Sequence, residues 1–196
     1  LPAKRVVFVT DPGLCDGSIV ASALENLRTG GITVELVADI ETNPRTTTAE
    51  RVALVARGAE AIIGFGGGSV MDAAKGAAML ATNPGRALDY VGANRFDHEP
   101  LPFVAVPTTC GTGSEVTWVS VLTDLERSSK VSLKGDGMFP DVALVDSDLL
   151  SGLPARLVAE SGLDALTHAL EATTGRRHNP AVDALAETSI DLTFRF

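Results

Sequence analysis

Hydrophobic and polar positions along the chain follow two alternating patterns. Short, nearly continuous runs of β-branched and aromatic residues alternate with longer stretches in which apolar residues recur every three or four positions. The first pattern is typical of buried strands and the second of amphipathic helices. The predicted strands are residues 5–10, 32–39, 61–65, 103–108 and 142–146, and the predicted helices are residues 17–29, 46–59 and 69–82.

This alternation of strands and helices predicts an α/β fold with a parallel sheet covered on both faces. In such folds ligands bind beyond the carboxyl ends of the strands. Between the last two strands, residues 118–135 form two alternating segments around a polar turn at 124–129, which predicts an inserted hairpin. The pattern becomes purely helical near residue 151. We therefore expect two domains, an α/β domain over 1–150 and the beginning of an all-helical domain over 151–196.

A glycine-rich run, GFGGGSVMDAAK at residues 64–75, joins a predicted strand to a predicted helix. Residues without a Cβ let the backbone approach an anion, and a helix N-terminus supplies N–H donors and partial positive charge. These features favour a phosphate or pyrophosphate ligand. Ser69 and Asp72 have the spacing of a capping pair, which predicts that they cap the helix start. A tight, capped turn without a ligand is the alternative interpretation.

A second candidate loop, PTTCGTGSEVT at residues 107–117, follows the predicted strand 103–108 and is rich in glycine and hydroxyl side chains. Two loops at the carboxyl ends of neighbouring strands are expected to face each other across a nucleotide-binding cleft. The alternative is a Ser/Thr-rich turn whose side chains bond to its own backbone.

The composition excludes several functional classes. The net charge of −9, from 16 basic and 25 acidic residues, argues against a nucleic-acid or anionic-membrane binder. The two cysteines, Cys15 and Cys110, are too few for a disulfide framework or a thiolate metal site, and they suit a reducing compartment. The sequence has neither a secretory leader nor a long apolar run, so we expect a cytoplasmic protein.

Three motifs, GGGSVMDAAK, PTTCGTGSEVT and GLDALTHALE, occur in this order along the chain. Together they resemble the iron-containing (group III) alcohol dehydrogenases, from the first strand to about residue 185. The resemblance implies a dinucleotide-binding domain over 1–150 and the beginning of a helical metal-binding domain over 151–196. The implied activity is NAD(P)-linked, metal-dependent interconversion of a small alcohol and an aldehyde or ketone. Family members are longer, so the chain resembles only their N-terminal part.

The resemblance also implies which residues contact the nucleotide. Asp11 matches a carboxylate that accepts a hydrogen bond from the adenosine ribose; because it would repel a 2′-phosphate, NAD is expected rather than NADP. A turn-forming role in Asp-Pro-Gly is the alternative for Asp11. Asn43 and Lys130 match positions near the nicotinamide. The pyrophosphate is expected at Gly66, Gly67, Gly68 and Ser69, and the other side of the nucleotide at Thr108, Thr109 and Thr112.

The third motif carries the expected metal ligands. Asp164 and His168 are four residues apart on a predicted helix, so they project from one face and offer an oxygen and a nitrogen to Fe2+ or Zn2+. The metal would polarise the oxygen of the substrate. A surface ion pair is the alternative for these two residues. The two further histidine ligands of the family lie beyond the residues present here.

Other functions stay open at this point. A dehydroquinate-synthase-type lyase shares the same architecture, NAD and metal. A truncated dinucleotide-binding module without turnover is the other alternative, because the sequence offers only half of the metal site. The expected partners are a small alcohol or aldehyde, with no nucleic acid and no membrane, and a homodimer is left open.

Overall fold

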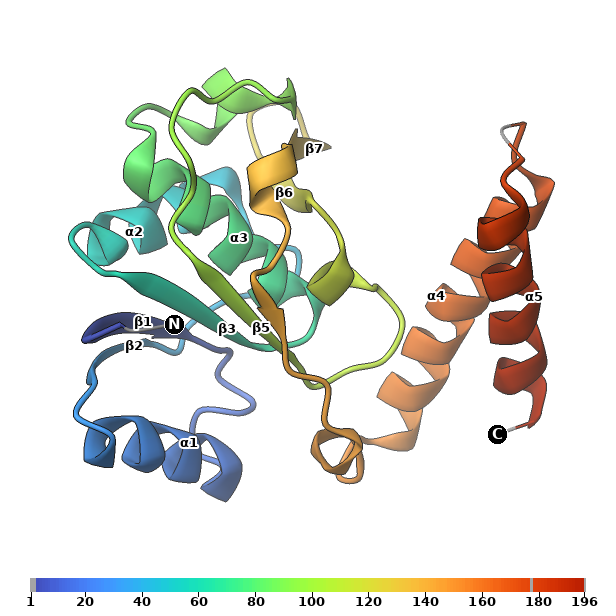
Figure 1. Ribbon diagram of the computed structural model, residues 1–196, viewed down its shortest axis with the longest axis horizontal. Coiled ribbons are helices and arrows are strands. Elements are labelled where there is room, and N and C mark those ends of the chain that lie inside the picture. Colours follow the sequence, from blue (N-terminus) through green and yellow to red (C-terminus); the bar gives the residue numbers. More distant parts are fainter. Residues whose placement is uncertain (1–2, 177, 196) are drawn as a thin grey trace. The chain divides into compact units, whose positions relative to one another are not determined.

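The computed structural model describes residues 3–176 and 178–195, and its elements follow the predicted order (Figure 1). Four short 3₁₀ turns lie at Ala87–Tyr90, Ser114–Val116, Asp136–Met138 and Ser147–Leu150. The helices and strands are β1 (Arg5–Val9), α1 (Ser18–Thr29), β2 (Thr33–Val37), α2 (Thr46–Ala56), β3 (Ala61–Gly66), α3 (Gly68–Thr82), β4 (Gly92–Ala93), β5 (Phe103–Pro107), β6 (Val119–Asp124), β7 (Ser129–Lys134), β8 (Val142–Ala143), α4 (Ala155–Thr174) and α5 (Pro180–Arg195).

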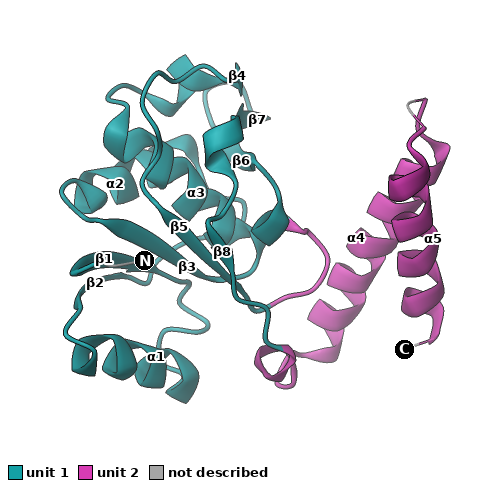
Figure 2. Cartoon of the chain, in the orientation of Figure 1, with its two compact units in different colours: residues 1–108, 114–146 teal, residues 109–113, 147–196 magenta. Residues whose placement is uncertain are grey.

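The chain divides into two compact units (Figure 2). Unit 1 contains residues 1–108 and 114–146, and unit 2 contains residues 109–113 and 147–196. Unit 2 therefore takes in five residues of the second candidate loop together with the helical segment. The division into a dinucleotide-binding domain over 1–150 and a helical domain over 151–196 stays a prediction.

The main sheet of unit 1 has the strand order β2-β1-β3-β5-β8, and all its pairings are parallel. The predicted parallel α/β fold is confirmed. Gly66 at the end of β3 lies opposite Pro107 at the end of β5, so both candidate loops leave the same edge of the sheet from neighbouring strands.

The last predicted strand, residues 142–146, is longer than the strand that forms. β8 contains only Val142 and Ala143, while Leu144 is 50% exposed and Val145 is 69% exposed. This strand lies at the edge of the sheet and pairs on one side only, so an apolar sequence there is not enough to extend the ladder.

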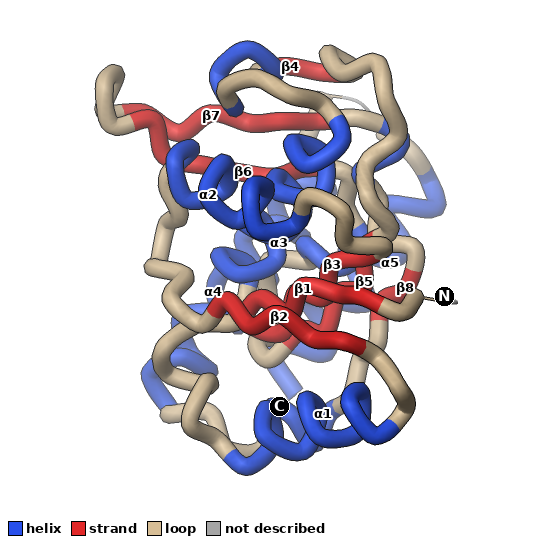
Figure 3. Tube along the Cα trace, turned by 90° about the vertical axis from the view of Figure 1, so that its left-hand side faces the viewer, coloured by secondary structure: helices blue, strands red, loops and turns tan. Residues whose placement is uncertain are grey.

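Helices α2 and α3 cover one face of the main sheet and α1 lies on the other (Figures 1 and 3). The hairpin of β6 and β7 packs on the side of α3 that faces away from the sheet (Figure 3). Its strands pair antiparallel from Val119 opposite Lys134 to Asp124 opposite Ser129, which confirms the predicted hairpin and its turn. Helix α3 is therefore enclosed between two sheets.

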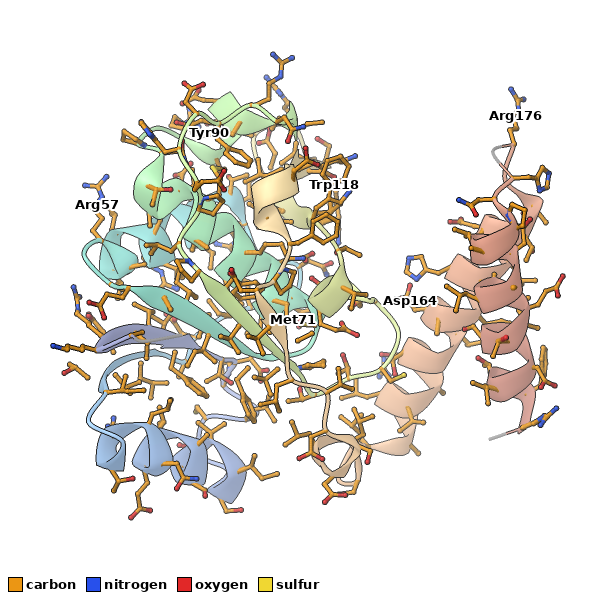
Figure 4. The ribbon with its side chains drawn as sticks, viewed as in Figure 1. Arg57, Met71, Tyr90, Trp118, Asp164 and Arg176 are labelled. Atoms are coloured by element: carbon orange, nitrogen blue, oxygen red, sulfur yellow. The ribbon has the colours of Figure 1, made fainter. Side chains whose placement is uncertain are left out.

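This enclosure accounts for the composition of α3. From Val70 to Leu80 every residue except Asp72 is buried. A helix covered on opposite sides must be apolar around most of its circumference, and the five alanines of α3 allow close packing. Met71, which is fully buried, lies on this helix (Figure 4).

In unit 2, α4 and α5 pack against each other and bury the small residues Ala169 and Ala186. No helix in the described part of the chain is both long enough and apolar enough to cross a membrane.

Gly76 is the point of closest approach between α3 and the hairpin. A Cβ at Gly76 would lie 2.9 Å from the Oγ atom of Ser120, a fully buried hydroxyl that donates to the carbonyl oxygen of Asp72. Gly76→Ala should therefore lower the free energy of unfolding by about 1–3 kcal/mol, although alanine favours a helix by about 1 kcal/mol. Denaturant unfolding measures the change.

Gly162→Ala in α4 is the matched control. A Cβ at Gly162 meets no atom within 4 Å, so this substitution should be neutral or stabilising. Stabilisation by both substitutions would show that the hairpin does not pack closely on α3.

Candidate functional site

The glycine run forms the junction between β3 and α3. Gly66 ends the strand, Gly67 is the N-cap residue, and the helix begins at Gly68. Gly67 has an extended conformation (φ −77°, ψ −175°), so the junction needs no left-handed residue there. Because Gly67 has no side chain, it cannot cap the first amides of the helix.

The prediction that Ser69 and Asp72 cap the start of the helix is wrong. The helix begins one residue earlier than the pattern indicates, and both side chains bond to other segments. The Ser69 hydroxyl accepts from the Asn43 amide at 3.2 Å. The Asp72 carboxylate accepts from the Ser114 hydroxyl at 2.7 Å and from the Val121 amide at 3.1 Å. The positive end of α3 is thus left without a side-chain cap.

Three of the predicted nucleotide-binding residues lie together beside this helix start. Asn43 has a left-handed backbone conformation (φ 55°), and its backbone amide donates to the Ser69 hydroxyl oxygen. The Lys130 ammonium group, from β7, donates to the Asn43 side-chain oxygen. The Thr123 hydroxyl donates to the Asn43 carbonyl oxygen at 3.1 Å, which attaches the hairpin to this segment. The hairpin therefore delivers a positive charge next to the glycine run.

The second loop begins at the same sheet edge. Thr108 is buried, and its amide donates to the Gly66 carbonyl oxygen at 3.0 Å. The chain is bound to α3 again at Ser114, whose hydroxyl donates to Asp72. The intervening residues, which include the predicted Thr109 and Thr112, belong to unit 2.

Within unit 2, the loop backbone packs directly on α4. Gly111 has a φ of +158°, and a Cβ there would overlap the carbonyl group of Ser161 in α4. Any side chain at this position would push the loop away from the helix. Asp164, the first predicted metal ligand, lies three residues beyond Ser161 on α4 (Figure 4).

Asp164 and His168 are neighbours, as their spacing predicts. The Asp164 Oδ2 and His168 Nδ1 atoms are 3.8 Å apart, and both side chains are about half exposed. This is also the geometry of the surface ion pair that the sequence left open. Among the described residues, no group of three or more His, Cys, Asp or Glu side chains could hold a metal ion. The pair can supply two donors of a larger set.

Asp11 lies just beyond the end of β1, at the same edge of the sheet as the two loops. Its Oδ1 atom accepts from the Gly13 amide at 2.8 Å, so the carboxylate does form the turn that the alternative interpretation predicted. A turn-forming carboxylate still carries its negative charge at the end of the strand.

Lys75 is a functional candidate that the sequence reasoning missed. Its side chain is 1% exposed, and its ammonium group donates to the carbonyl oxygens of Ser114, Thr117 and Val119 at 2.7, 2.8 and 3.0 Å. Burial lowers the pKa of Lys75 to about 8, against the attraction of Asp72 and Glu115. The available signal was a lysine within a stretch, residues 73–81, in which every other residue is glycine or apolar.

The family follows from a comparison of sequences. The profile described as iron-containing alcohol dehydrogenase matches residues 1–147, which is most of the chain. The chain belongs to the iron-containing alcohol dehydrogenase family.

Individual relatives in the family agree with this assignment. Long-chain-alcohol dehydrogenase 1 of Geobacillus thermodenitrificans is 40% identical over all of this chain and 50% of its own length. A crystal structure of 1,3-propanediol oxidoreductase matches with a TM-score of 0.93 and 38% identity, over 98% of this chain and 51% of that one.

A third relative was solved with a nucleotide. The sulfoacetaldehyde reductase of Bifidobacterium kashiwanohense, in complex with NAD+, matches with a TM-score of 0.89 and 33% identity, over 99% of this chain and 52% of that one. The chain spans about half the length of the curated relatives it matches.

Proposed function

We propose that this chain binds NAD and forms the cofactor-binding part of an oxidoreductase that interconverts a small alcohol and an aldehyde or ketone. The observation that carries the proposal is the uncapped start of α3, which lies at the carboxyl ends of β3 and β5. The relative from Bifidobacterium kashiwanohense was solved in complex with NAD+, which supports this choice of ligand.

The pyrophosphate of NAD would lie on the backbone of Gly66, Gly67, Gly68 and Ser69. Amide donors and the helix dipole both favour an anion there, and the absence of side chains at the glycines allows close approach. Lys130 adds a positive charge near Ser69 through their common partner Asn43. Thr108, Thr109 and Thr112 would offer hydroxyl groups to the other side of the nucleotide.

Gly67→Val tests the pyrophosphate site. The backbone conformation of Gly67 is open to any residue, so the variant should fold with an unchanged unfolding midpoint. Its side chain would occupy the space of a phosphate, and we expect the affinity for NADH to fall at least about a hundredfold. Fluorescence titration with NADH gives the affinity; an unchanged value in a folded variant would rule out this site.

Asp11 would determine the choice between NAD and NADP. Its carboxylate would accept a hydrogen bond from a ribose hydroxyl, and its negative charge would repel a 2′-phosphate. Asp11→Asn is the sharpest substitution, because it removes the charge and keeps an oxygen that can accept from the Gly13 amide. We expect the ratio of NADH to NADPH affinity to fall about tenfold or more. A constant ratio in both titrations would leave Asp11 with its turn-forming role alone.

Asp164 and His168 would supply two ligands to a divalent cation. Their mixed oxygen and nitrogen donors suit both Fe2+ and Zn2+. When bound, such an ion supplies Lewis-acid polarisation of the substrate oxygen. The two residues fit the role of partial ligands because they are close together and accessible, and further donors would be needed to complete the site.

The metal site is tested by titration calorimetry with Zn2+. His168→Ala should weaken Zn2+ binding about tenfold or more, because one of two protein ligands is lost. His178→Ala is the matched control, since His178 forms a similar pair with Asp183 at 3.7 Å outside the motif. An equal loss of Zn2+ affinity in the two variants would show that Asp164 and His168 form only a surface ion pair.

Nucleotide binding without turnover is the second candidate function. It is favoured by the observation that the described residues supply only two clustered metal ligands. The family match favours alcohol chemistry over the lyase reaction. Production of NADH from simple alcohols, measured on this chain with added metal, separates binding from turnover.

A further inference from the structure

Lys75 is a buried cation with no part in the function proposed above. Its ammonium group has three protons, and three backbone carbonyl oxygens converge on it, from Ser114, Thr117 and Val119. The hydroxyl oxygens of Ser114 and Thr117 lie at 3.1 and 3.3 Å from the same nitrogen. The side chain is nearly inaccessible to water, so these bonds replace its hydration.

Asp72, about one turn earlier on α3, bonds to both ends of the segment formed by residues 114–121. Its carboxylate accepts from the Ser114 hydroxyl and the Val121 amide, and its backbone carbonyl accepts from the Ser120 hydroxyl at 2.7 Å. Ser114 is thus bonded to both Asp72 and Lys75. Residues 114–121 are fastened along one side of α3 by these two charged side chains.

The irregular conformation of this segment explains why it needs such a partner. Between Ser114 and Val119 the chain makes a 3₁₀ turn and then a bend before β6 begins. The carbonyl groups of Ser114, Thr117 and Val119 therefore point to a single position, where Lys75 supplies the donors. An apolar residue in place of Lys75 would remove the donor that these three buried or partly buried carbonyl groups share, which is costly.

The position of the segment connects it to the proposed nucleotide site. It contains the last four residues of the second loop, 114–117, and the other end of that loop is attached to Gly66 through the amide of Thr108. It also continues into β6, where Thr123 binds the carbonyl oxygens of Asn43 and Pro44. Both the end of the second loop and the hairpin that carries Lys130 thus depend on where residues 114–121 lie on α3.

We propose that Lys75 is a positioning residue for nucleotide binding, which holds residues 114–119 and the hairpin in the arrangement that the cofactor requires. The site is then formed before the nucleotide arrives, and ordering the segment costs little of the binding energy. This inference rests on the proposed binding of NAD. The hydrogen-bond partners of Lys75 are Ser114, Thr117 and Val119. They include neither the first residues of α3 nor a predicted nucleotide-binding side chain.

Lys75→Met tests the role of the ammonium group, because methionine fills a similar volume without donating hydrogen bonds. We expect the NADH dissociation constant to rise at least about tenfold at a temperature where the variant is folded. In the variant, hydrogen exchange at the amides of residues 114–121 should be faster than in the unsubstituted chain. Added NADH should no longer slow this exchange.

Asn83→Ala is the matched control for stability. Asn83 is 2% exposed at the opposite end of α3, where its side chain bonds to the backbone of Met79, Asp97 and His98. Its loss should destabilise the fold and leave the NADH dissociation constant within about twofold of the original. Equal weakening of NADH binding in both variants would show that Lys75 acts only through stability, and would overturn the inference.

Ser114→Ala keeps the inference testable if Lys75→Met does not fold. It removes one of the three hydrogen bonds that join Asp72 to the segment and retains Lys75, so NADH binding should weaken about threefold to tenfold. An unchanged dissociation constant would overturn the inference. If the unsubstituted chain itself does not bind NADH, the proposed function fails instead, so the two failures are distinct.

Discussion

The enclosure of α3 between two sheets is the constraint on which the rest of the structure depends. The helix packs against β3 and β5 on one side and against β6 on the other, so it has to be made of small and apolar residues. Its two charged side chains, Asp72 and Lys75, bond to the end of the second loop at Ser114. The same packing that stabilises unit 1 thus positions the segments around the first turn of α3.

Much of the fold could be predicted because the local pattern and the tertiary environment agree. The strands at 61–65 and 103–108 are apolar along their length, and the structure covers the sheet on both faces. The hairpin was predictable from its alternation and polar turn. The strand predicted at 142–146 is longer than the one that forms, because the pattern does not show that this strand lies at the edge of the sheet.

The geometry of the candidate site was predictable only where spacing along one element decides it. Asp164 and His168 are close because they are four residues apart on one helix. Ser69 and Asp72 have the spacing of a capping pair, yet their partners come from Asn43, Ser114 and Val121, which are distant in sequence. Lys75 was missed for the same reason, since three carbonyl groups of an irregular segment cannot be placed from a pattern.

The central claim is that the uncapped first turn of α3 binds the pyrophosphate of NAD, and amide chemical-shift mapping by NMR tests it most directly. NADH, and ADP-ribose as a probe without the nicotinamide, would each be titrated into the labelled chain. We expect both to produce the largest shifts at the amides of residues 67–70, because these groups would donate to the phosphates. Saturating binding that leaves these amides unshifted, with the largest changes elsewhere in the chain, would contradict the claim.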